Sequence, residues 1–337
     1  MKQHTVQAFT ALQVAMAEAY GVGDVTRNFA VSIPMETRLN DAIQSSSDFL
    51  QRINIIPVTD KIGQALNMVI SSTLARRTDT SGTGERKPKD ASGPDGMKYT
   101  CVKTEFDVAI TYALLDAWAR FPNFQERYMQ HVYRRIALDR ILIGWHGTSA
   151  ATNTDDAANP NLEDVNIGWL KLLEDNNAAN FLTESTDATG KITLGPAGDY
   201  KNLDALAYDI YSMIGDAHRT GNEVAVVGRG LVADDMGKVL TSHAQQPTEK
   251  NHIQIMEKSY GGLPTLTVPG FPDTGLVVTD LENLSIYWQE GSMRRKSEDN
   301  ARRDRVEDFN SSNEAYVIED TKGIAGIKAG NVQFAEA

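Results

Sequence analysis

The sequence of 337 residues contains a single cysteine, Cys101. One cysteine cannot form an internal disulfide, and without a second one it provides neither a redox pair nor a soft metal cluster. Long hydrophobic runs are missing too: even the apolar residues 136–145 include Asp139 and Arg140, whereas a membrane span needs about 18 apolar residues. Polar residues also interrupt the first 21 positions, which argues against a secretory signal. The sequence therefore predicts a protein that is made in the cytosol, is not secreted and does not cross a membrane.

Motifs for catalysis, cofactors and metals are missing as well. Gly82 and Gly84 resemble the start of a dinucleotide-binding turn, but Lys87 stands where that turn requires its third glycine. The sequence has no P-loop and no Gly-x-Ser-x-Gly elbow, and its six histidines show no metal-ligand spacing. We therefore predict no catalytic residue, no cofactor and no metal site. A hydrolase with an unrecognised serine or carboxylate site is the alternative from a different functional class.

The composition that is present is that of an ordinary globular protein with an excess of acid. Hydrophobic residues make up 41% of the chain and charged residues 23%, which argues against a disordered polypeptide. Lys and Arg number 33 against 45 Asp and Glu, so the formal net charge is −12. This balance disfavours a basic nucleic-acid-binding domain. The length suggests about two domains of roughly 150 residues each.

The first 58 residues are predicted to form a helix followed by an arm. Residues 1–29 contain an amphipathic helix that ends at Gly21, and we expect it to be a detachable segment. Residues 30–58 are predicted to form an extended arm. One face of the helix carries four apolar residues at spacings of three and four: Phe9, Leu12, Met16 and Tyr20.

A long polar segment follows at residues 78–98. It is dense in Gly, Ser, Thr, Asp and Pro and has almost no large apolar residue, so it is predicted to be an exposed loop. Strand-like residues flank it at 66–74 and 99–112. We therefore predict a long projecting hairpin over residues 59–112.

The clearest helix is predicted over residues 121–145. Pro122 suits its first turn, where a missing N–H is harmless, and Gly144 and Gly147 are predicted to end it. A helix of this length can serve as a spine for the fold. Its apolar face is made of Phe124, Tyr128, Val132, Ile136, Leu138, Ile141, Leu142 and Trp145.

Helices and strands alternate in the remainder, which predicts an α+β fold. Asp199 is predicted to cap the first helix of this part. Residues 284–288 alternate between large apolar and other side chains, a pattern typical of a half-buried strand. The last two strands are predicted to pack beside the long helix. The other predicted elements are helices at 203–214 and 231–240 and strands at 224–227, 276–278, 315–318 and 323–328.

Two clusters of basic residues stand out in this acidic chain. Their simplest interpretation is a solvated charged surface, and with a negative net charge we expect at most weak contact with phosphates. The first cluster, in or beside the polar loop, is Arg76, Arg77, Arg86, Lys87 and Lys89. The second, near the C-terminus, is Arg294, Arg295, Lys296, Arg302, Arg303 and Arg305.

Seven segments carry a resemblance to a known family, in the order SSDFLQRINIIPV, TDTSGTGERKPKD, WARFPNFQERY, NPNLEDVNIGWL, GDYKNLDALAYD, VVGRGLVADD and LENLSIYW. They resemble the Peduovirus-type myophage major capsid proteins, and the order of elements is similar to the Hong Kong 97 fold of tailed-bacteriophage capsids. The resemblance implies a structural protein that forms hexamers and pentamers and closes into an icosahedral shell around double-stranded DNA. An encapsulin-like bacterial nanocompartment shell, which shares this fold, is the alternative.

The resemblance also implies a division of the chain and a set of partners. A phage-encoded prohead protease would remove the propiece at a junction near Phe29 and Ala30. The other implied partners are an internal scaffold, a portal protein, decoration proteins as an optional partner, and packaged DNA through weak, non-specific contact. The protein would assemble in the bacterial host cytoplasm and end in the virion. The implied parts are a propiece (1–29), an N-arm (30–58), an extended loop (59–112), a peripheral domain (113–197 and 293–337) and an axial domain (198–292).

Charge adds a prediction about how subunits meet. Residues 71–103 carry seven bases and four acids, whereas residues 150–190 carry eight acids and one base. We therefore predict that the first basic cluster of one subunit lies on an acidic surface of its neighbour, where charge complementarity fixes register more than affinity. The acidic residues of that predicted surface are Asp155, Asp156, Glu163 and Asp164.

Overall fold

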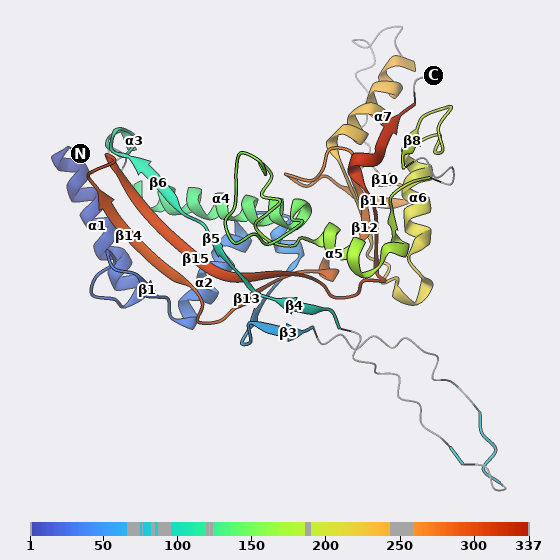
Figure 1. The fold of residues 1–337 in the computed structure, drawn as a ribbon, viewed down its shortest axis with the longest axis horizontal. Coiled ribbons are helices and arrows are strands. Elements are labelled where there is room, and N and C mark those ends of the chain that lie inside the picture. The colour runs from blue at the N-terminus through green and yellow to red at the C-terminus, as the bar shows by residue number, and fades with distance from the viewer. Residues whose placement is uncertain are drawn as a thin grey trace.

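The computed structural model describes residues 2–65, 75, 77–81, 85–86, 96–118, 121, 124–185, 190–242 and 259–335. Helices and strands are mixed along this part of the chain, which confirms the predicted α+β class. Figure 1 shows an elongated molecule in which a long sheet with α4 (Phe124–His146) lies towards one end and a second sheet with α6 (Leu203–Met213) and α7 (Arg229–Ser242) towards the other. No helix in these ranges is both long and apolar enough to span a bilayer.

The larger sheet joins segments that are far apart in the sequence. Its strands, in order, are β1 (Phe29–Ala30), β14 (Arg294–Asn300), β15 (Arg305–Ile318), β13 (Leu284–Gln289) and β2 (Asn54–Val58), and β5 (Val102–Glu105) and β6 (Val108–Thr111) also pair with β15. The first half of β15 pairs with β14 and β6, and the second half pairs with β13. The strand predicted at residues 315–318 is therefore the end of a much longer strand that organises the sheet.

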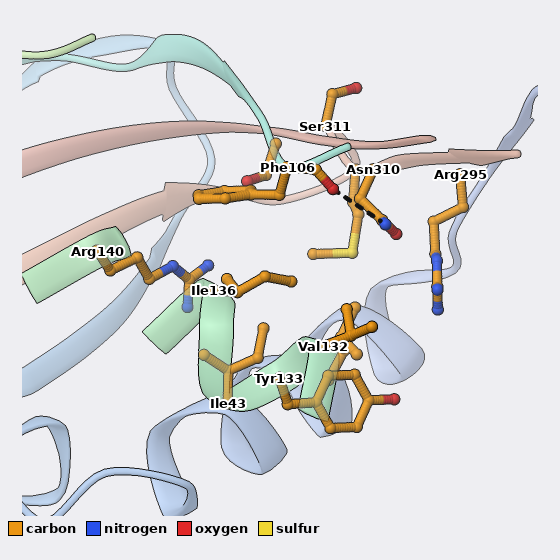
Figure 2. Close-up of a pocket in the computed structure, with 12 residues that line it drawn as sticks. Ile43, Phe106, Val132, Tyr133, Ile136, Arg140, Arg295, Asn310 and Ser311 are labelled. Carbon is orange, nitrogen blue, oxygen red and sulfur yellow. Dashed lines mark hydrogen bonds between the residues drawn. The ribbon is translucent and has the colours of Figure 1, made fainter. Parts of the chain in front are cut away.

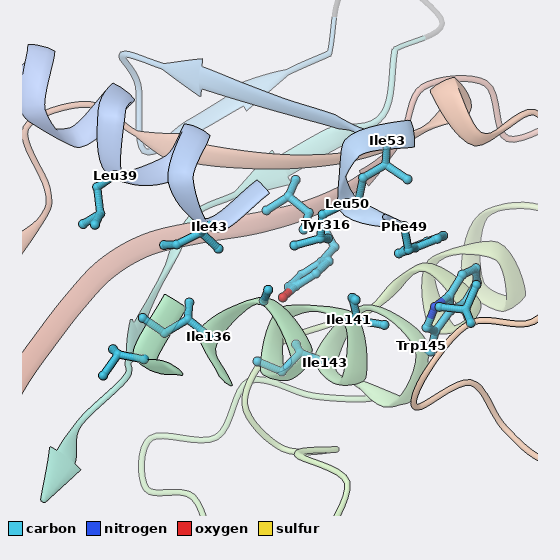
Figure 3. Packing of buried hydrophobic residues seen from close by; sticks show 14 of the residues in the cluster. Leu39, Ile43, Phe49, Leu50, Ile53, Ile136, Ile141, Ile143, Trp145 and Tyr316 are labelled. Carbon is cyan, nitrogen blue, oxygen red and sulfur yellow. The ribbon is translucent and has the colours of Figure 1, made fainter. Parts of the chain in front are cut away.

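The predicted spine helix is confirmed as α4, which packs against this sheet. The Tyr316 hydroxyl of β15 donates a hydrogen bond to the Arg140 carbonyl at 3.1 Å, so the predicted return of this strand to the helix is also confirmed. Burial of each large aliphatic side chain contributes about 1.5–3 kcal/mol. Figure 3 shows the resulting core, in which α4 contributes Ile136, Ile141, Ile143 and Trp145 and the facing segments contribute Leu39, Ile43, Phe49, Leu50, Ile53 and Tyr316.

Gly144 lies inside α4 and does not end it, contrary to the prediction. The short helix α5 (Trp169–Asn176) packs against α4, and a Cβ atom at position 144 would overlap the Trp169 ring. The helix ends just before Gly147, whose N–H still donates to the Ile143 carbonyl at 2.8 Å. The glycine at position 144 is therefore needed for close packing and not as a helix stop.

We expect Gly144→Ala to lower the free energy of unfolding by about 1–3 kcal/mol, because the added methyl group displaces the fully buried Trp169 ring. Gly237→Ala, at a position in α7 where an added Cβ meets nothing within 4 Å, is the matched control. It should leave stability unchanged or raise it by up to about 1 kcal/mol. Chemical denaturation of the unassembled subunit measures both, and equal effects would contradict the packing explanation.

An arm extended throughout residues 30–58 is not what the structure contains. The chain forms the helix α2 (Ile33–Ser45), followed by the 3-10 turn η1 (Leu50–Arg52) and then β2. Pro34 lies in the first turn of α2, where it favours helix initiation. Leu39 and Ile43, four residues apart, are buried in the core. Proline and this spacing were the available signals for a helix.

A buried carboxylate fixes α2 to the sheet. Glu36 has no exposed surface, and its two carboxylate oxygens accept hydrogen bonds from the backbone N–H groups of Gly291 at 2.8 Å and Met293 at 2.9 Å. These residues lie at the turn between β13 and β14. Because a buried carboxylate is costly without such partners, α2 and this turn hold each other in place.

The smaller sheet has its own hydrophobic core. Its order is β10 (Ser259–Tyr260), β11 (Leu263–Leu266), β9 (Val224–Val227), β12 (Leu276–Thr279), β16 (Ile324–Ile327) and β7 (Phe181–Leu182). Leu206 and Ile210 of α6 pack in one cluster with Val227 and Val278 from its strands. The predicted strand at 224–227 is confirmed, and α7 confirms the helix predicted at 231–240.

Three details of the chain after residue 198 differ from the prediction. Asn202, not Asp199, caps α6, because its side-chain oxygen accepts from the Ala205 N–H at 2.8 Å, whereas Asp199 accepts from the Thr193 N–H at 2.9 Å. The strand β13 is buried on both faces, since α5 covers one of them, as the Trp169 Nε1–H bond to the Ser285 carbonyl at 3.2 Å shows. The strand predicted at 323–328 pairs within the smaller sheet and not beside α4.

Two short ladders complete the fold. β3 (Ile62–Gln64) pairs antiparallel with β4 (Lys98–Thr100), so the residues between them leave and re-enter the fold side by side, as the predicted hairpin requires. The strand-like residues predicted at 66–74 lie outside the described residues. At the other end of the molecule, β8 (Ile192–Leu194) pairs with β17 (Val332–Phe334).

Candidate assembly surfaces

The N-terminal helix α1 (Gln3–Tyr20) packs on the main core through its predicted apolar face. Gly21 ends the helix in a left-handed conformation, with φ of +66°. At the start of the helix, the Lys2 N–H donates to the Asp116 carboxylate at 3.0 Å, and Asp116 belongs to α3 (Tyr112–Trp118). The helix is thus part of the folded subunit. Its core residues are Phe9, Leu12 and Met16.

The predicted cleavage junction lies in β1, at the edge of the larger sheet. Phe29 is paired in register with Arg295 and Ala30 with Arg294. The Phe29 side chain is half-buried and its ring centroid lies 5.5 Å from that of Tyr20, whereas Ala30 is exposed. The junction is therefore an extended segment on the surface, held by a two-residue strand.

The first basic cluster is only partly within the described residues. Arg77 and Arg86 are exposed. Arg76, Lys87 and Lys89 lie outside the described residues. The β3–β4 ladder at the base of the hairpin packs on the sheet through Tyr99, whose ring lies 5.0 Å from the Tyr287 ring.

The acidic segment, residues 155–164, is held in its conformation by hydrogen bonds from backbone N–H groups to its own carboxylates. The Asp164 side chain is buried and accepts from the Asp155 N–H at 2.8 Å. One Asp155 carboxylate oxygen accepts from the Ala157 N–H at 3.0 Å, and the Glu163 carboxylate accepts from the Asn161 N–H at 2.9 Å. Asp155 and Asp156 are exposed, Glu163 is half-buried, and Asp164 has no free face. Two of the four predicted residues thus present their charge openly to solvent.

A surface groove separates this acidic segment from the base of the hairpin. It has a volume of about 700 Å³. One wall is formed by residues 100–105 of β4 and β5 with Lys61, and the other by residues 151–154 with Val165. The hairpin of a subunit therefore starts beside that subunit's own acidic segment.

Three of the six residues of the second basic cluster are paired with carboxylates or buried. Lys296 pairs with Glu298 at 2.5 Å, and Arg305 pairs with Glu307 at 2.6 Å. Arg295 is 3% exposed, because its guanidinium donates to the Tyr20 hydroxyl and lies 5.2 Å from the centre of that ring. The exposed members are Arg294, Arg302 and Arg303.

Sequence reasoning missed a buried ion pair between the spine helix and β15. Arg140 and Glu314 are each 1% exposed and are joined by two hydrogen bonds, at 2.6 and 3.2 Å. Arg140 also donates to the Asn40 side chain of α2 at 2.8 Å, and the Ser312 hydroxyl donates to Glu314 at 2.6 Å. A charged residue inside the apolar run 136–145 was the available signal for such a pair.

Figure 2 shows the cavity of about 20 Å³ that lies next to this ion pair. Arg140 and Arg295 stand at its opposite ends, and Val132 and Ile136 of α4 lie between them. Phe106 covers the Arg140 end, with its ring centre 5.9 Å from the guanidinium carbon. The cavity is too small for an organic substrate and is part of the packing between α4 and the sheet.

Two side chains that could take part in nucleophilic or acid–base chemistry, Cys101 and Tyr128, are buried. Cys101 is completely buried, and burial raises the pKa of its thiol to about 11, so it stays protonated near neutral pH. Burial and the neighbouring Asp308 carboxylate raise the pKa of Tyr128. Among the described residues, no group of His, Cys, Asp and Glu is placed to hold a metal ion.

Comparison with known proteins identifies the family. A family model described as "Phage major capsid protein, P2 family" matches residues 8–329. The chain belongs to this family. It is 38% identical over 331 residues to the protein named "Capsid proteins" of Escherichia phage P2, a match that covers 95% of this chain and 92% of that protein. It is 34% identical over 313 residues to the major capsid protein of Serratia phage KSP20, covering 90% and 89%.

A solved structure agrees with the sequence relatives. The fold of this P2-family chain matches a chain of the satellite phage P4 procapsid that includes the size determination (Sid) protein, with a TM-score of 0.81 and 34% identity, covering 100% of this chain and 99% of that one. The chain is therefore a tailed-phage major capsid protein of the Hong Kong 97 type that forms the head shell of the virion. This identification replaces the encapsulin alternative.

Proposed function

We propose that this capsid protein builds its shell from hexamers and pentamers in which the hairpin between β3 and β4 reaches the acidic segment of the next subunit. The observation that carries the proposal is the opposite charge balance of two segments, seven bases against four acids over residues 71–103 and eight acids against one base over residues 150–190. Arg77 and Arg86 of the first segment and Asp155 and Asp156 of the second are exposed. Exposed ion pairs contribute only about 0.2–1 kcal/mol each. The shell is stabilised because these weak ion pairs are repeated at every interface between subunits.

The hydrogen bonds that Asp164 and Glu163 make within their own segment refine this proposal. Asp164 is buried and Glu163 is half-buried, and their carboxylates accept hydrogen bonds from backbone N–H groups of the segment, so they shape the acceptor surface. Asp155 also accepts a backbone hydrogen bond, but it is exposed like Asp156, and these two side chains present the charge. Because complementary charge mainly guides approach and register, the acidic segment acts as the guide for the neighbour's hairpin.

We further propose that a prohead protease cuts the chain between Phe29 and Ala30. The support is the position of this bond in an extended two-residue edge strand in which Ala30 is exposed, because proteases generally bind their substrates in an extended conformation. Cutting would separate α1 from a chain that starts at Ala30. This step would belong to the maturation of the procapsid.

N-terminal sequencing of the protein from mature particles tests the cut. We expect a sequence that begins at Ala30, together with an intact-mass decrease that matches the loss of residues 1–29. Protein from particles made without the protease should begin at the original N-terminus and is the control. A start at Met1 in mature particles would refute the cleavage, and a start elsewhere would refute this bond.

The remaining partners follow from the same role. We propose that the chain acts by assembly and not by catalysis, together with an internal scaffold, a portal protein and, optionally, decoration proteins. Contact with packaged DNA would be weak and non-specific, which agrees with the net charge of −12 and with the paired state of Lys296 and Arg305. Strong phosphate contacts would hinder packaging and release.

A further inference from the structure

We propose that the subunit has a non-covalent binding site for its own propiece, which keeps residues 2–29 in place after the chain is cut. The ligand is an amphipathic helical peptide with a C-terminal extended tail. This inference rests on the proposed cleavage at Ala30. The inference is based on the contacts that residues 2–29 make with the rest of the subunit. These contacts lie upstream of the cut bond, and none of them requires that bond to be intact.

The first set of contacts anchors the start of α1. The Lys2 N–H donates to the Asp116 carboxylate of α3 at 3.0 Å, and hydrogen bonds from Thr5 and Lys2 hold the pKa of Asp116 below its usual value. Thr5 is 2% exposed. In Figure 1, α1 lies at the end of the molecule beside α3 and β14.

The second set is the apolar face of α1. Phe9, Leu12 and Met16 are 5–6% exposed and belong to the same core cluster as Leu115 of α3 and Val132 of α4. A peptide helix with an apolar face in a groove is a common mode of peptide recognition. The outward face is different, since Val14 is 52% exposed.

The third set joins the end of the propiece to β14. The Arg295 guanidinium donates to the Tyr20 hydroxyl and faces the Tyr20 ring. The Ser297 N–H donates to the Val25 carbonyl at 2.8 Å, and Val25 is buried. The tail thus runs beside β14, and its removal would uncover the guanidinium of Arg295.

Cutting the chain removes a tether and leaves these three sets of contacts unchanged. A tether acts as a high effective concentration, roughly millimolar for a short flexible linker, so loss of the tether releases the peptide only if the free peptide is diluted. Release of the propiece should therefore follow dilution of the freed peptide and not the cut itself.

A full-length chain with an inserted site for a sequence-specific protease tests the proposal. The insertion belongs between Arg27 and Asn28, because both residues are exposed and the Arg27 side chain is 88% exposed. After the folded, unassembled subunit is cut, gel filtration separates bound from free peptide. We expect the peptide to elute with the rest of the chain and to leave it on dilution, with a dissociation constant on the order of 10 μM.

Two substitutions that each add one carboxylate to α1 form a matched pair. Leu12→Asp places the charge in the apolar face and should raise the dissociation constant at least about tenfold, whereas Val14→Asp places it on the exposed face and should leave the dissociation constant unchanged. If Leu12→Asp fails to fold before the cut, Tyr20→Phe replaces it. Loss of this hydroxyl alone should weaken binding by roughly three- to tenfold.

The proposal would be overturned if the subunit without substitutions in α1 lost the peptide immediately after the cut, at subunit concentrations well above the expected dissociation constant. Equal retention in Leu12→Asp and Val14→Asp would do the same, because the binding would then not depend on the apolar face of α1. The engineered cut is independent of the native protease. N-terminal sequencing of mature particles can therefore refute the natural cleavage while this assay still supports the peptide site, or the reverse.

Discussion

Arg140→Met should lower the free energy of unfolding by about 3–5 kcal/mol, because it leaves the Glu314 carboxylate buried without its cation. Both side chains are 1% exposed and share two hydrogen bonds. The same arginine also holds Asn40 of α2 at 2.8 Å. The substitution therefore loosens the contact of the spine helix with β15 and with α2 together. Urea unfolding of the unassembled subunit, followed by tryptophan fluorescence, measures this loss.

Arg135→Met is the matched control, since it removes the same charge from the same helix at an exposed position. Arg135 pairs with Asp139 at 2.9 Å, and the two side chains are 63% and 20% exposed, so the loss should be smaller than at position 140, where both partners are buried. The double substitution Arg140→Met and Glu314→Leu removes both buried charges and should recover more than half of the lost stability. Similar losses of unfolding free energy at positions 140 and 135 would show that the buried Arg140–Glu314 pair contributes no more to stability than a surface pair.

Local patterns were sufficient to predict much of the fold. The apolar spacing in α1 and α4 predicted both helices, and the run at 224–227 predicted a buried strand, because these elements bury one face or one short segment. The helix α2 was missed because only Leu39 and Ile43 mark its buried face clearly. Its remaining buried members, Glu36 and Asn40, are polar and are satisfied by partners about 250 and 100 residues away. Such partners cannot be read from a local pattern.

For the candidate surfaces, the sequence predicted only the sign of the charge of each segment and not which of its side chains are exposed. Composition identified an acidic segment and two basic clusters, but it could not tell that Arg295 is covered by Tyr20 or that Asp164 caps its own segment. Both depend on which residues the fold brings together. Of the four acidic residues predicted for the contact, Asp155 and Asp156 are the fully exposed ones. Arg295 is buried against Tyr20 of α1 and is not a surface base.

Reversal of two charges on the hairpin, Arg86→Glu with Lys87→Glu, should prevent shell assembly at about 0.1 M salt. Each subunit would then present acid to the acidic segment of its neighbour, and like charges in contact disfavour association. At ionic strengths near 1 M the Debye length falls to about 3 Å, so part of the assembly should return. Electron microscopy and sedimentation of the protein expressed with its assembly partners measure shell yield across this salt range.

Two further variants separate a specific contact from a general effect of charge. Arg302→Glu with Arg303→Glu changes net charge by the same amount at exposed positions of the β14–β15 turn, and shells should still form. Asp155→Lys with Asp156→Lys, added to the hairpin reversal, exchanges the signs on the two surfaces and should restore assembly at low salt. Because every subunit carries both changes, each interface regains opposite charges. Normal assembly of the hairpin variant at every salt concentration, or failure of the exchange to restore any shells, would place the partner of the hairpin on another surface of the subunit.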